Sequence, residues 1–379
     1  MPKFIDSLTF KSGATVKNRL FMSPMTTQQS FYNGTVTRDE IDYYAQRAAG
    51  LGAVITGAAN VQDGGKGWPG ELSIAGDQYL PELSQLARAI QGRGAKAIVQ
   101  IFHAGRMTSS ATLSGAQPVS ASAVAALRPD AEVPRAMTVD EIHATVAAFG
   151  EATRRAITAG FDGIELHGAN TYLLQQFFSP HSNRRTDEYG GSLEKRYRFI
   201  SEVISSVFAA VDKYADRPFI VGYRVSPEEF ETPGIRFTDT LWLLDQLRKT
   251  RLDYLHLSLN NYSRKSQDPA YQDQSMLGYV HDELAGQLPL IGVGGVRSRA
   301  DVTAVLENAD AVAVGQQLLF DPEWAQKLAA AADDTILTAP FTAAVKTAPL
   351  NTPLKDFVSS MITSRAERIA AYRKQHPKQ

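Results

Sequence analysis

The chain has 379 residues, 44% of them hydrophobic, which suits one large barrel or two ordinary domains. Its 39 basic and 40 acidic residues give a formal net charge of -1, so no basic stripe is available for nucleic acid or an anionic membrane. The absence of cysteine excludes disulfides and cysteine-ligated clusters, and 7 histidines without clustered spacing argue against a metal site. Without a signal-like or membrane-spanning apolar run, we expect a cytoplasmic protein.

Short apolar runs alternate with helical stretches along the chain. Residues 8–16 predict a hairpin, and the later runs are almost entirely apolar, as strands buried on both faces of a sheet require. Thr138 and Glu141 form a capping box that starts one helix. The expected strands are 20–22, 53–56, 97–102, 163–166, 219–225, 254–259, 289–293 and 311–314, and the expected helices are 37–49, 80–91, 137–159, 192–213, 239–249, 299–307 and 322–331.

About eight strand-then-helix units of this kind predict an α/β fold, a (β/α)8 TIM barrel, in preference to a doubly wound sheet. Loops 104–137, 169–191, 226–237 and 260–278 all follow strands, where such barrels build their active sites.

The predicted domain organisation is a barrel over residues 1–340, with the hairpin at its start, and a C-terminal helical extension over residues 341–379. An amphipathic basic helix in this extension is typical of packing or of a subunit contact, and a homodimer is one arrangement that would use it. Its apolar positions are Phe357, Met361, Ile362, Ile369 and Tyr372.

The stretch 163–191 carries the strongest chemical signal. An apolar strand, 163–166, is followed at once by His167, Asn170 and Tyr172. Imidazole and carboxamide can both donate to one oxygen and polarise a carbonyl or nitro group, while a phenol can supply a proton. Because His and Asn in loops are commonly ordinary turn residues, this hypothesis needs support from elsewhere in the chain.

That support comes from a shared location. Several polar or glycine residues fall at the carboxyl ends of predicted strands and therefore face one mouth of the barrel. Each has a structural alternative: Thr26 could cap a turn, Gln100 could be a satisfied polar core group, and Arg224 could pair with a buried carboxylate. The residues at these ends are Thr26, Ala58, Gln100, His167, Arg224, Gly294 and Gly315.

A glycine-rich run, 291–297, lies between a strand and a helix. It lacks dinucleotide-fold spacing, because Arg297 stands where the third glycine of G-x-G-x-x-G is needed. Together with Gly315 after the last strand, the run predicts a cradle of backbone N–H groups for a phosphate. A phosphorylated cofactor across the mouth is the natural inference.

These residues also resemble a known family. The chain is similar to the old yellow enzyme family of FMN-dependent ene-reductases over roughly residues 3–335, an NADH:flavin oxidoreductase family with single-domain members. The resemblance is carried by LTFKSGATVKNRLFMSPMT near the start, AIVQIFHAGR at 97–106, HGANTYLLQQFFSPHSNRRTDEYGGSLEKRYRF at 167–199, VGYRVSP at 221–227 and VGQQLLFDPEW at 314–324.

The resemblance implies non-covalent FMN, its reduction by NADH or NADPH, and reduction of an activated C=C bond in an enone, enal, maleimide or nitroalkene. His167 and Asn170 would bind the substrate oxygen, hydride would reach the β-carbon from the flavin, and Tyr172 would protonate the α-carbon. The residues implied to contact FMN are Pro24, Met25, Thr26, Ala58, Gln100, Arg224, Gly294, Gly295, Gly315 and Gln316. A small activated alkene is therefore the expected partner, with no metal.

Gln316 departs from the family pattern. The residue after the last strand glycine is usually an arginine on the FMN phosphate, and Arg297 or Arg299 are the candidates to compensate. The HAGR block is similar to a branch whose larger members carry iron–sulfur clusters; without cysteine, we expect electrons to come directly from a nicotinamide.

Two alternatives stay open from the residues themselves. One is a (β/α)8 barrel doing aldolase or isomerase chemistry on a phosphorylated substrate with His167 and Tyr172, although no strand-end lysine is evident. The other is a non-catalytic flavin-binding sensor whose tail engages a partner.

Overall fold

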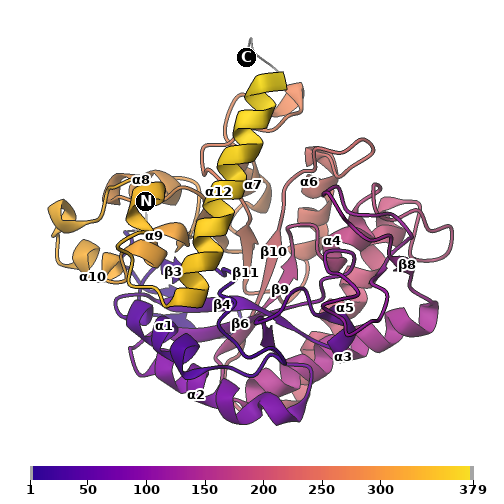
Figure 1. Cartoon of the computed structure of the whole chain (residues 1–379), viewed down its shortest axis with the longest axis horizontal. Coiled ribbons are helices and arrows are strands. Elements are labelled where there is room, and N and C mark those ends of the chain that lie inside the picture. The colour runs from indigo at the N-terminus through magenta and orange to yellow at the C-terminus, as the bar shows by residue number, and fades with distance from the viewer. Residues whose placement is uncertain (1–2, 376–379) are drawn as a thin grey trace.

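The computed structural model describes residues 3–375 and has eight parallel strands closed into a barrel, with helices outside it (Figure 1). Closure is complete because the first barrel strand pairs with both the second and the last. The (β/α)8 prediction is therefore confirmed. In barrel order the strands are β3 Leu20–Met22, β4 Ala53–Asn60, β6 Lys96–Phe102, β9 Gly163–Gly168, β10 Ile220–Val225, β11 Tyr254–Leu257, β12 Leu290–Val293 and β13 Ala311–Val314.

The helices largely follow the expected alternation. Thr138 and Glu141 form the predicted capping box, and Ser192 caps the long fifth helix by accepting from Lys195 N. The bounds are α1 Arg38–Ala48, α2 Leu80–Gln91, α3 Val139–Thr158, α4 Leu173–Phe178, α5 Leu193–Tyr214, α6 Phe237–Leu247, α7 Met276–Leu284, α8 Arg299–Leu306, α9 Gln316–Phe320, α10 Trp324–Ala329, α11 Phe341–Ala344 and α12 Thr352–Gln375.

Three helical assignments differ from the sequence prediction. The six residues of α4 lie in a stretch expected to be loop, and all six are buried, so they show no amphipathic period to detect. Helix α7 is capped by Ser275 and was not predicted. The last barrel helix, expected as 322–331, is the shorter α10, and an additional short helix that was not predicted, α9, precedes it, separated from it by the turn at Asp321 and Pro322.

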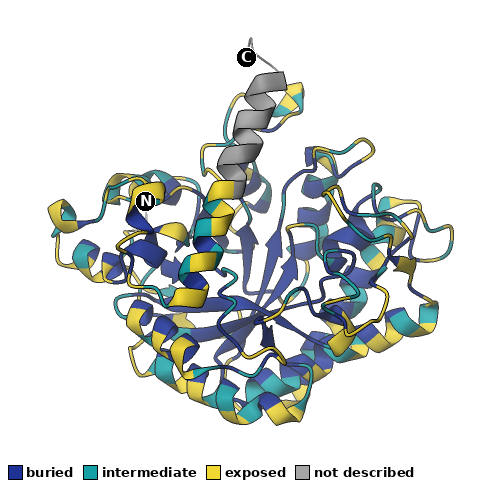
Figure 2. Cartoon of the chain, in the orientation of Figure 1, coloured by how far each residue is buried: buried dark blue, intermediate teal, exposed yellow. Residues whose placement is uncertain are grey.

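The predicted hairpin, β1 Leu8–Thr9 with β2 Thr15–Val16, closes the amino-terminal end of the barrel. Its apolar side chains pack on inward-facing residues of the strands, so this end of the barrel is an apolar core. The barrel strands are coloured as buried in Figure 2. The hairpin residues of this cluster are Phe10, Ala14 and Val16, and their partners include Phe21, Ile55, Ile98, Ile220, Tyr254 and Ile291.

Strand β4 is longer than predicted and contains a bulge between Ile55 and Ala58. The bulge takes Gly57 out of the regular ladder, and its N–H donates to the Tyr44 hydroxyl over 2.7 Å. Beyond it the strand returns to register with Ala58 opposite Gln100. A bulge close to the mouth of a barrel bends the strand and changes the direction of its backbone there.

The C-terminal extension packs against the barrel through the first turns of α12. Leu354 and Val358 are buried, Phe357 and Ile362 are partly buried, and Met361 is exposed. The two remaining positions of the predicted stripe, Ile369 and Tyr372, lie outside the residues whose side chains are described. The division at residue 340 stays a prediction.

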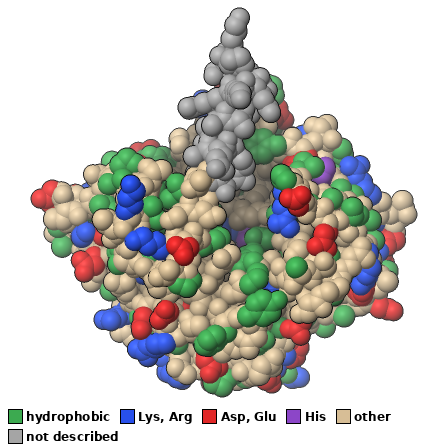
Figure 3. Space-filling model, in the orientation of Figure 1, with side chains coloured by type: hydrophobic (Ala, Val, Ile, Leu, Met, Phe, Trp, Pro, Cys, Tyr) green, Lys and Arg blue, Asp and Glu red, His purple; other side chains and the backbone are tan. Residues whose placement is uncertain are grey.

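Within the described residues, no helix is long and apolar enough to cross a bilayer, and no group of three or more His, Asp or Glu side chains could hold a metal ion. Acidic and basic side chains are interspersed on the face in Figure 3.

Glu40 ties α1 to the segment that follows β3. Its carboxylate accepts from Thr27 Oγ1 over 2.6 Å and from Ser30 Oγ, and the residue is fully buried. Burial raises the pKa of Glu40 from 4.5 to about 7, against the opposing effect of the two hydroxyls. The folded protein therefore keeps a proton that the unfolded chain has already released.

This difference predicts that stability falls as pH rises from about 4.5 through about 7. One pKa unit corresponds to about 1.4 kcal/mol, so the loss is on the order of 3 kcal/mol. Glu40→Gln should remove it and gain stability relative to the parent at pH 8 but not at pH 4.5, as measured by urea unfolding at both values. Exposed Glu323→Gln is the control, and an unchanged pH slope in Glu40→Gln would contradict the assignment.

Candidate active site

Inward-facing side chains form two layers below the mouth. Register places Gln100 beside Glu165, Glu165 beside Gly222, and Gly222 beside Tyr254 in the lower layer. In the upper layer Arg224 lies between His167 and His256. Both layers arise because alternate residues of a barrel strand point inward.

Glu165 is the centre of the lower layer, and sequence reasoning missed it. Its carboxylate is completely buried and accepts hydrogen bonds from Gln100 Nε2 at 2.7 Å, Tyr254 OH at 3.1 Å and His256 Nδ1 at 2.9 Å. Burial alone would raise its pKa, but the hydrogen bonds from His256 and Gln100 and the nearby charge of Arg224 outweigh it and hold the pKa below its usual range. Glu165 is therefore ionised, while burial lowers the pKa of His256 and keeps its ring neutral.

Gly222 makes this arrangement possible. A Cβ at this position would fall 2.1 Å from the ring of Tyr254, so only glycine leaves room for the tyrosine to cross the barrel and reach Glu165. The alternation of Glu165 and His167 along one strand was the available signal, but the apolar run around them hid it.

Gln100 has the structural partner that the sequence left open, whereas Arg224 forms no ion pair with a carboxylate among the described residues. Gln100 gives its amide N–H to Glu165, which leaves its carbonyl oxygen for another partner. Arg224 is 7% exposed, and its Nε is buried without a hydrogen-bond partner in the described protein. A buried guanidinium with an unused donor points to an acceptor that the polypeptide does not supply.

His167 is a neutral hydrogen-bond donor. Burial, with Arg224 and His256 nearby, holds its pKa well below its usual range. Its Nδ1 accepts from the backbone N–H of Ala169 over 3.3 Å, so the ring proton lies on Nε2. The structure thus orients this imidazole as an N–H donor.

Tyr172 packs edge-on against His167 and Phe102, with ring centroids 4.8 Å and 4.9 Å away, and Trp68 lies 6.3 Å away. Burial, with the carboxyl of Glu71 nearby, raises its pKa, so the phenol keeps its proton. Trp68 and Phe102 were not identified from the sequence, because aromatic residues after strands are ordinary core residues.

Asn170 lies at the rim, exposed and with a left-handed backbone, φ 55°. Its N–H donates to Ser226 Oγ over 2.9 Å, and its Oδ1 accepts from Ser258 Oγ over 3.0 Å. With the oxygen engaged, the side-chain amide N–H is the free group. Asn170 also borders a cleft of about 390 Å³ between the loops after β9, β10 and β11, walled by Ser226, Glu229, Phe230, Ser258 and Arg264.

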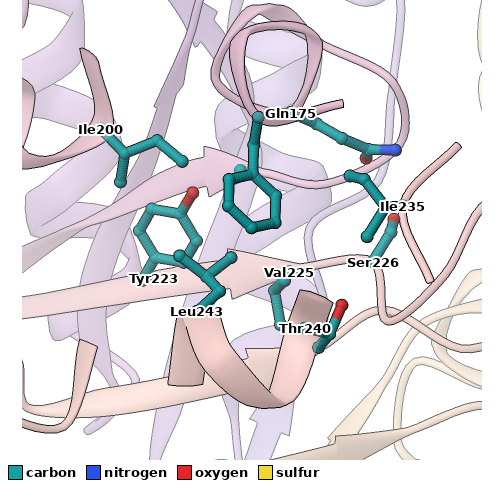
Figure 4. Close-up of a pocket in the computed structure, with 10 residues that line it drawn as sticks. Gln175, Ile200, Tyr223, Val225, Ser226, Ile235, Thr240 and Leu243 are labelled. Atoms are coloured by element: carbon teal, nitrogen blue, oxygen red, sulfur yellow. The ribbon is translucent and has the colours of Figure 1, made fainter. Parts of the chain in front are cut away.

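A second cavity has a volume of about 10 Å³. It lies on the outer face of β10, between the barrel and its helices, and is lined by Tyr223, Ile200, Leu243 and Thr240 (Figure 4). This volume holds no more than a water molecule.

The two predicted phosphate-binding turns have suitable backbones. Gly294 and Gly295 have φ of 120° and 71°, and a Cβ on Gly294 would lie 2.7 Å from Asn261 N. Gly315 precedes α9, Gln316 is exposed, and a Cβ on Gly315 would lie 3.0 Å from Met25 Sδ. Met25 and this last turn are therefore neighbours, as the predicted FMN contacts require.

Arg297 and Arg299 are committed elsewhere. Arg297 donates to Gln317 Oε1 and to the carbonyls of Leu337 and Ala339, at 3.0, 3.2 and 2.7 Å. Arg299 pairs with Asp333 at 2.8 Å. Neither guanidinium is free in this arrangement to replace the arginine that Gln316 lacks.

The comparisons agree with this geometry. The NADH:flavin oxidoreductase / NADH oxidase family model matches residues 4–334. NADH:acrylate oxidoreductase of Vibrio harveyi is 44% identical over 370 residues, 97% of this chain but 37% of that protein. Probable NADH-dependent flavin oxidoreductase YqiG of Bacillus subtilis is 44% identical over 331 residues, covering 86% and 88%. The old yellow enzyme homologue from Zymomonas mobilis superposes with TM-score 0.75 at 27% identity, covering 87% and 93%.

Fold and matches together define a flavin-dependent (β/α)8 barrel. The chain belongs to the NADH:flavin oxidoreductase / NADH oxidase family, which confirms the old yellow enzyme resemblance. FMN, with NADH or NADPH as reductant, is the cofactor of this class. This membership favours redox chemistry over the aldolase or isomerase alternative. The residues fit FMN: the glycine turns suit its phosphate, and Gln100 and Arg224 offer a free carbonyl and a free donor.

The absence of a free arginine at the last turn predicts weakened phosphate binding. A charged hydrogen bond contributes about 1.5–3 kcal/mol and a neutral one about 0.5–1.5 kcal/mol, so Gln316→Arg should tighten FMN binding about tenfold in titrations of the apoprotein. Arg299→Ala is the control and should leave the FMN affinity unchanged, because its guanidinium is held by Asp333. If Arg299→Ala weakens FMN binding instead, that arginine contacts the phosphate.

Proposed function

We propose that this chain is an ene-reductase that takes hydride from NADH or NADPH and reduces the activated C=C bond of a small alkene. Bound FMN supplies the hydride transfer. The carrying observation is that His167 and Asn170 both have their acceptor atoms occupied, by Ala169 N–H and by Ser258 Oγ, which leaves an N–H donor on each.

Two such donors on one oxygen would draw electrons from the conjugated double bond and make the β-carbon electrophilic. A neutral imidazole suits this role, because it can donate a hydrogen bond without giving up its proton to the substrate. The phenol of Tyr172 is protonated before the reaction, so it would supply the proton that the α-carbon needs. Ser258 and Ser226 act as positioning residues, since they set the amide and the backbone of Asn170.

The substrate class is an alkene conjugated to an oxygen-bearing group. Enones, enals, maleimides and nitroalkenes present such an oxygen. The Vibrio harveyi relative is an NADH:acrylate oxidoreductase, which adds unsaturated carboxylates to this class. The cleft beside Asn170 would admit substituents, with Phe230 exposed at its wall.

The direct test is anaerobic. FMN-loaded protein should be bleached by NADH or NADPH and recoloured by 2-cyclohexenone or acrylate, followed at the flavin absorption band. Failure to take up FMN would overturn the proposal, and FMN uptake without bleaching or recolouring would favour the sensor alternative.

Tyr172→Phe separates the two half-reactions. General acid catalysis contributes about 10²–10⁴-fold, so this variant should slow recolouring by 2-cyclohexenone by about that factor and leave bleaching by nicotinamide nearly unchanged in stopped-flow measurements. Tyr223→Phe, a buried tyrosine on the outer face of β10, is the matched control and should change neither rate. Equal damage to both half-reactions in Tyr172→Phe would refute the proton-donor role.

A further inference from the structure

The buried carboxylate of Glu165 has no part in binding substrate. It contacts Gln100 and is influenced by the charge of Arg224, and both of these residues are expected to hold the flavin. It accepts from Gln100 at 2.7 Å, and Arg224 is among the groups that lower its pKa. All three side chains are at most 7% exposed. A charge in such a place acts through a medium much less polarisable than water.

The charges in this part of the barrel balance. Arg224 is positive, Glu165 is ionised, and His256 and His167 are neutral because burial lowers the pKa of both. Tyr254 is buried and protonated, since burial raises its pKa. These five side chains therefore carry one positive and one negative charge in total.

Two-electron reduction of FMN with uptake of one proton adds one negative charge to the cofactor. Arg224 would stabilise that charge, and a carboxylate behind it would oppose it. Gln100 acts in the same direction, because its amide N–H donates to Glu165 at 2.7 Å, which leaves its carbonyl oxygen, an acceptor, for the flavin.

We propose that Glu165 is a positioning residue that lowers the reduction potential of the bound flavin, by offsetting the charge of Arg224 and fixing the orientation of the Gln100 amide. This inference rests on the proposed function and on the expected contacts of Gln100 and Arg224 with FMN. A lower potential makes the reduced cofactor a stronger hydride donor and its reduction by nicotinamide less favourable.

The test is the reduction potential of FMN-loaded protein, measured by equilibration with a reference dye. Glu165→Gln keeps the size of the side chain and removes its charge. It should shift the equilibrium toward reduced flavin at least tenfold, about 30 mV for a two-electron couple. Glu165→Asp, which keeps the charge, should stay closer to the parent. An unchanged potential in Glu165→Gln would overturn the inference.

Asp162→Asn is the matched control, because Asp162 is a buried carboxylate at the start of the same strand, bonded to Ala97 N at 2.9 Å. It should weaken folding without shifting the potential. An equal shift in Asp162→Asn would mean that the effect is structural.

If Glu165→Gln does not fold because the charge of Arg224 is no longer offset, the same comparison is made in proteins that lack this arginine. Glu165→Gln with Arg224→Gln should have a higher potential than Arg224→Gln alone, and equal potentials would overturn the inference. A further outcome is that the parent protein binds FMN and is bleached by NADH while these variants all have the same reduction potential. That result would refute the role of Glu165 and leave the proposed function intact.

Discussion

A carboxylate in the apolar interior of a barrel needs hydrogen-bond donors, and several side chains below the mouth of this barrel provide them for Glu165. Gln100 reaches it from β6, Tyr254 and His256 reach it from β11, and Gly222 leaves the space that Tyr254 needs. An ionised group without such donors would be strongly destabilising in this place. The network therefore links neighbouring strands and orients the side chains directly under the mouth.

As a result, the polarity of the barrel interior changes along its axis. The amino-terminal end is apolar and sealed by the hairpin, the middle holds the balanced pair of Glu165 and Arg224, and the mouth presents the N–H groups of His167 and Asn170. The aromatic rings around Tyr172 keep the phenol protonated by excluding water. Rigid strands hold the lower groups, while Asn170 depends on serines from two other loops.

The phosphate-side turns are connected to the chain beyond the barrel. Arg297 follows the glycine turn and bonds the carbonyls of Leu337 and Ala339, and its guanidinium lies 4.7 Å from the ring of Phe341. Gln317, one residue after Gln316, donates to the same Leu337 carbonyl over 2.9 Å. Residues 337–341 are thus bound to the turns that would hold FMN. They also engage the guanidinium of Arg297, which could otherwise have reached the phosphate.

The sequence by itself determined the barrel, because buried parallel strands need unbroken apolar runs and the turns need glycine and capping residues, as at Thr138 and Gly294. It also placed His167, Asn170, Tyr172 and the strand-end residues at one mouth, since side-chain location follows from chain order in this fold. Only the tertiary structure decided hydrogen-bond direction and charge. The ionisation of Glu165 and the diversion of Arg297 depend on partners 91 and 42 residues away in the chain, and local sequence carries no information about those contacts. The tautomer of His167 depends on the folded geometry of the turn that brings the N–H of Ala169 to its ring.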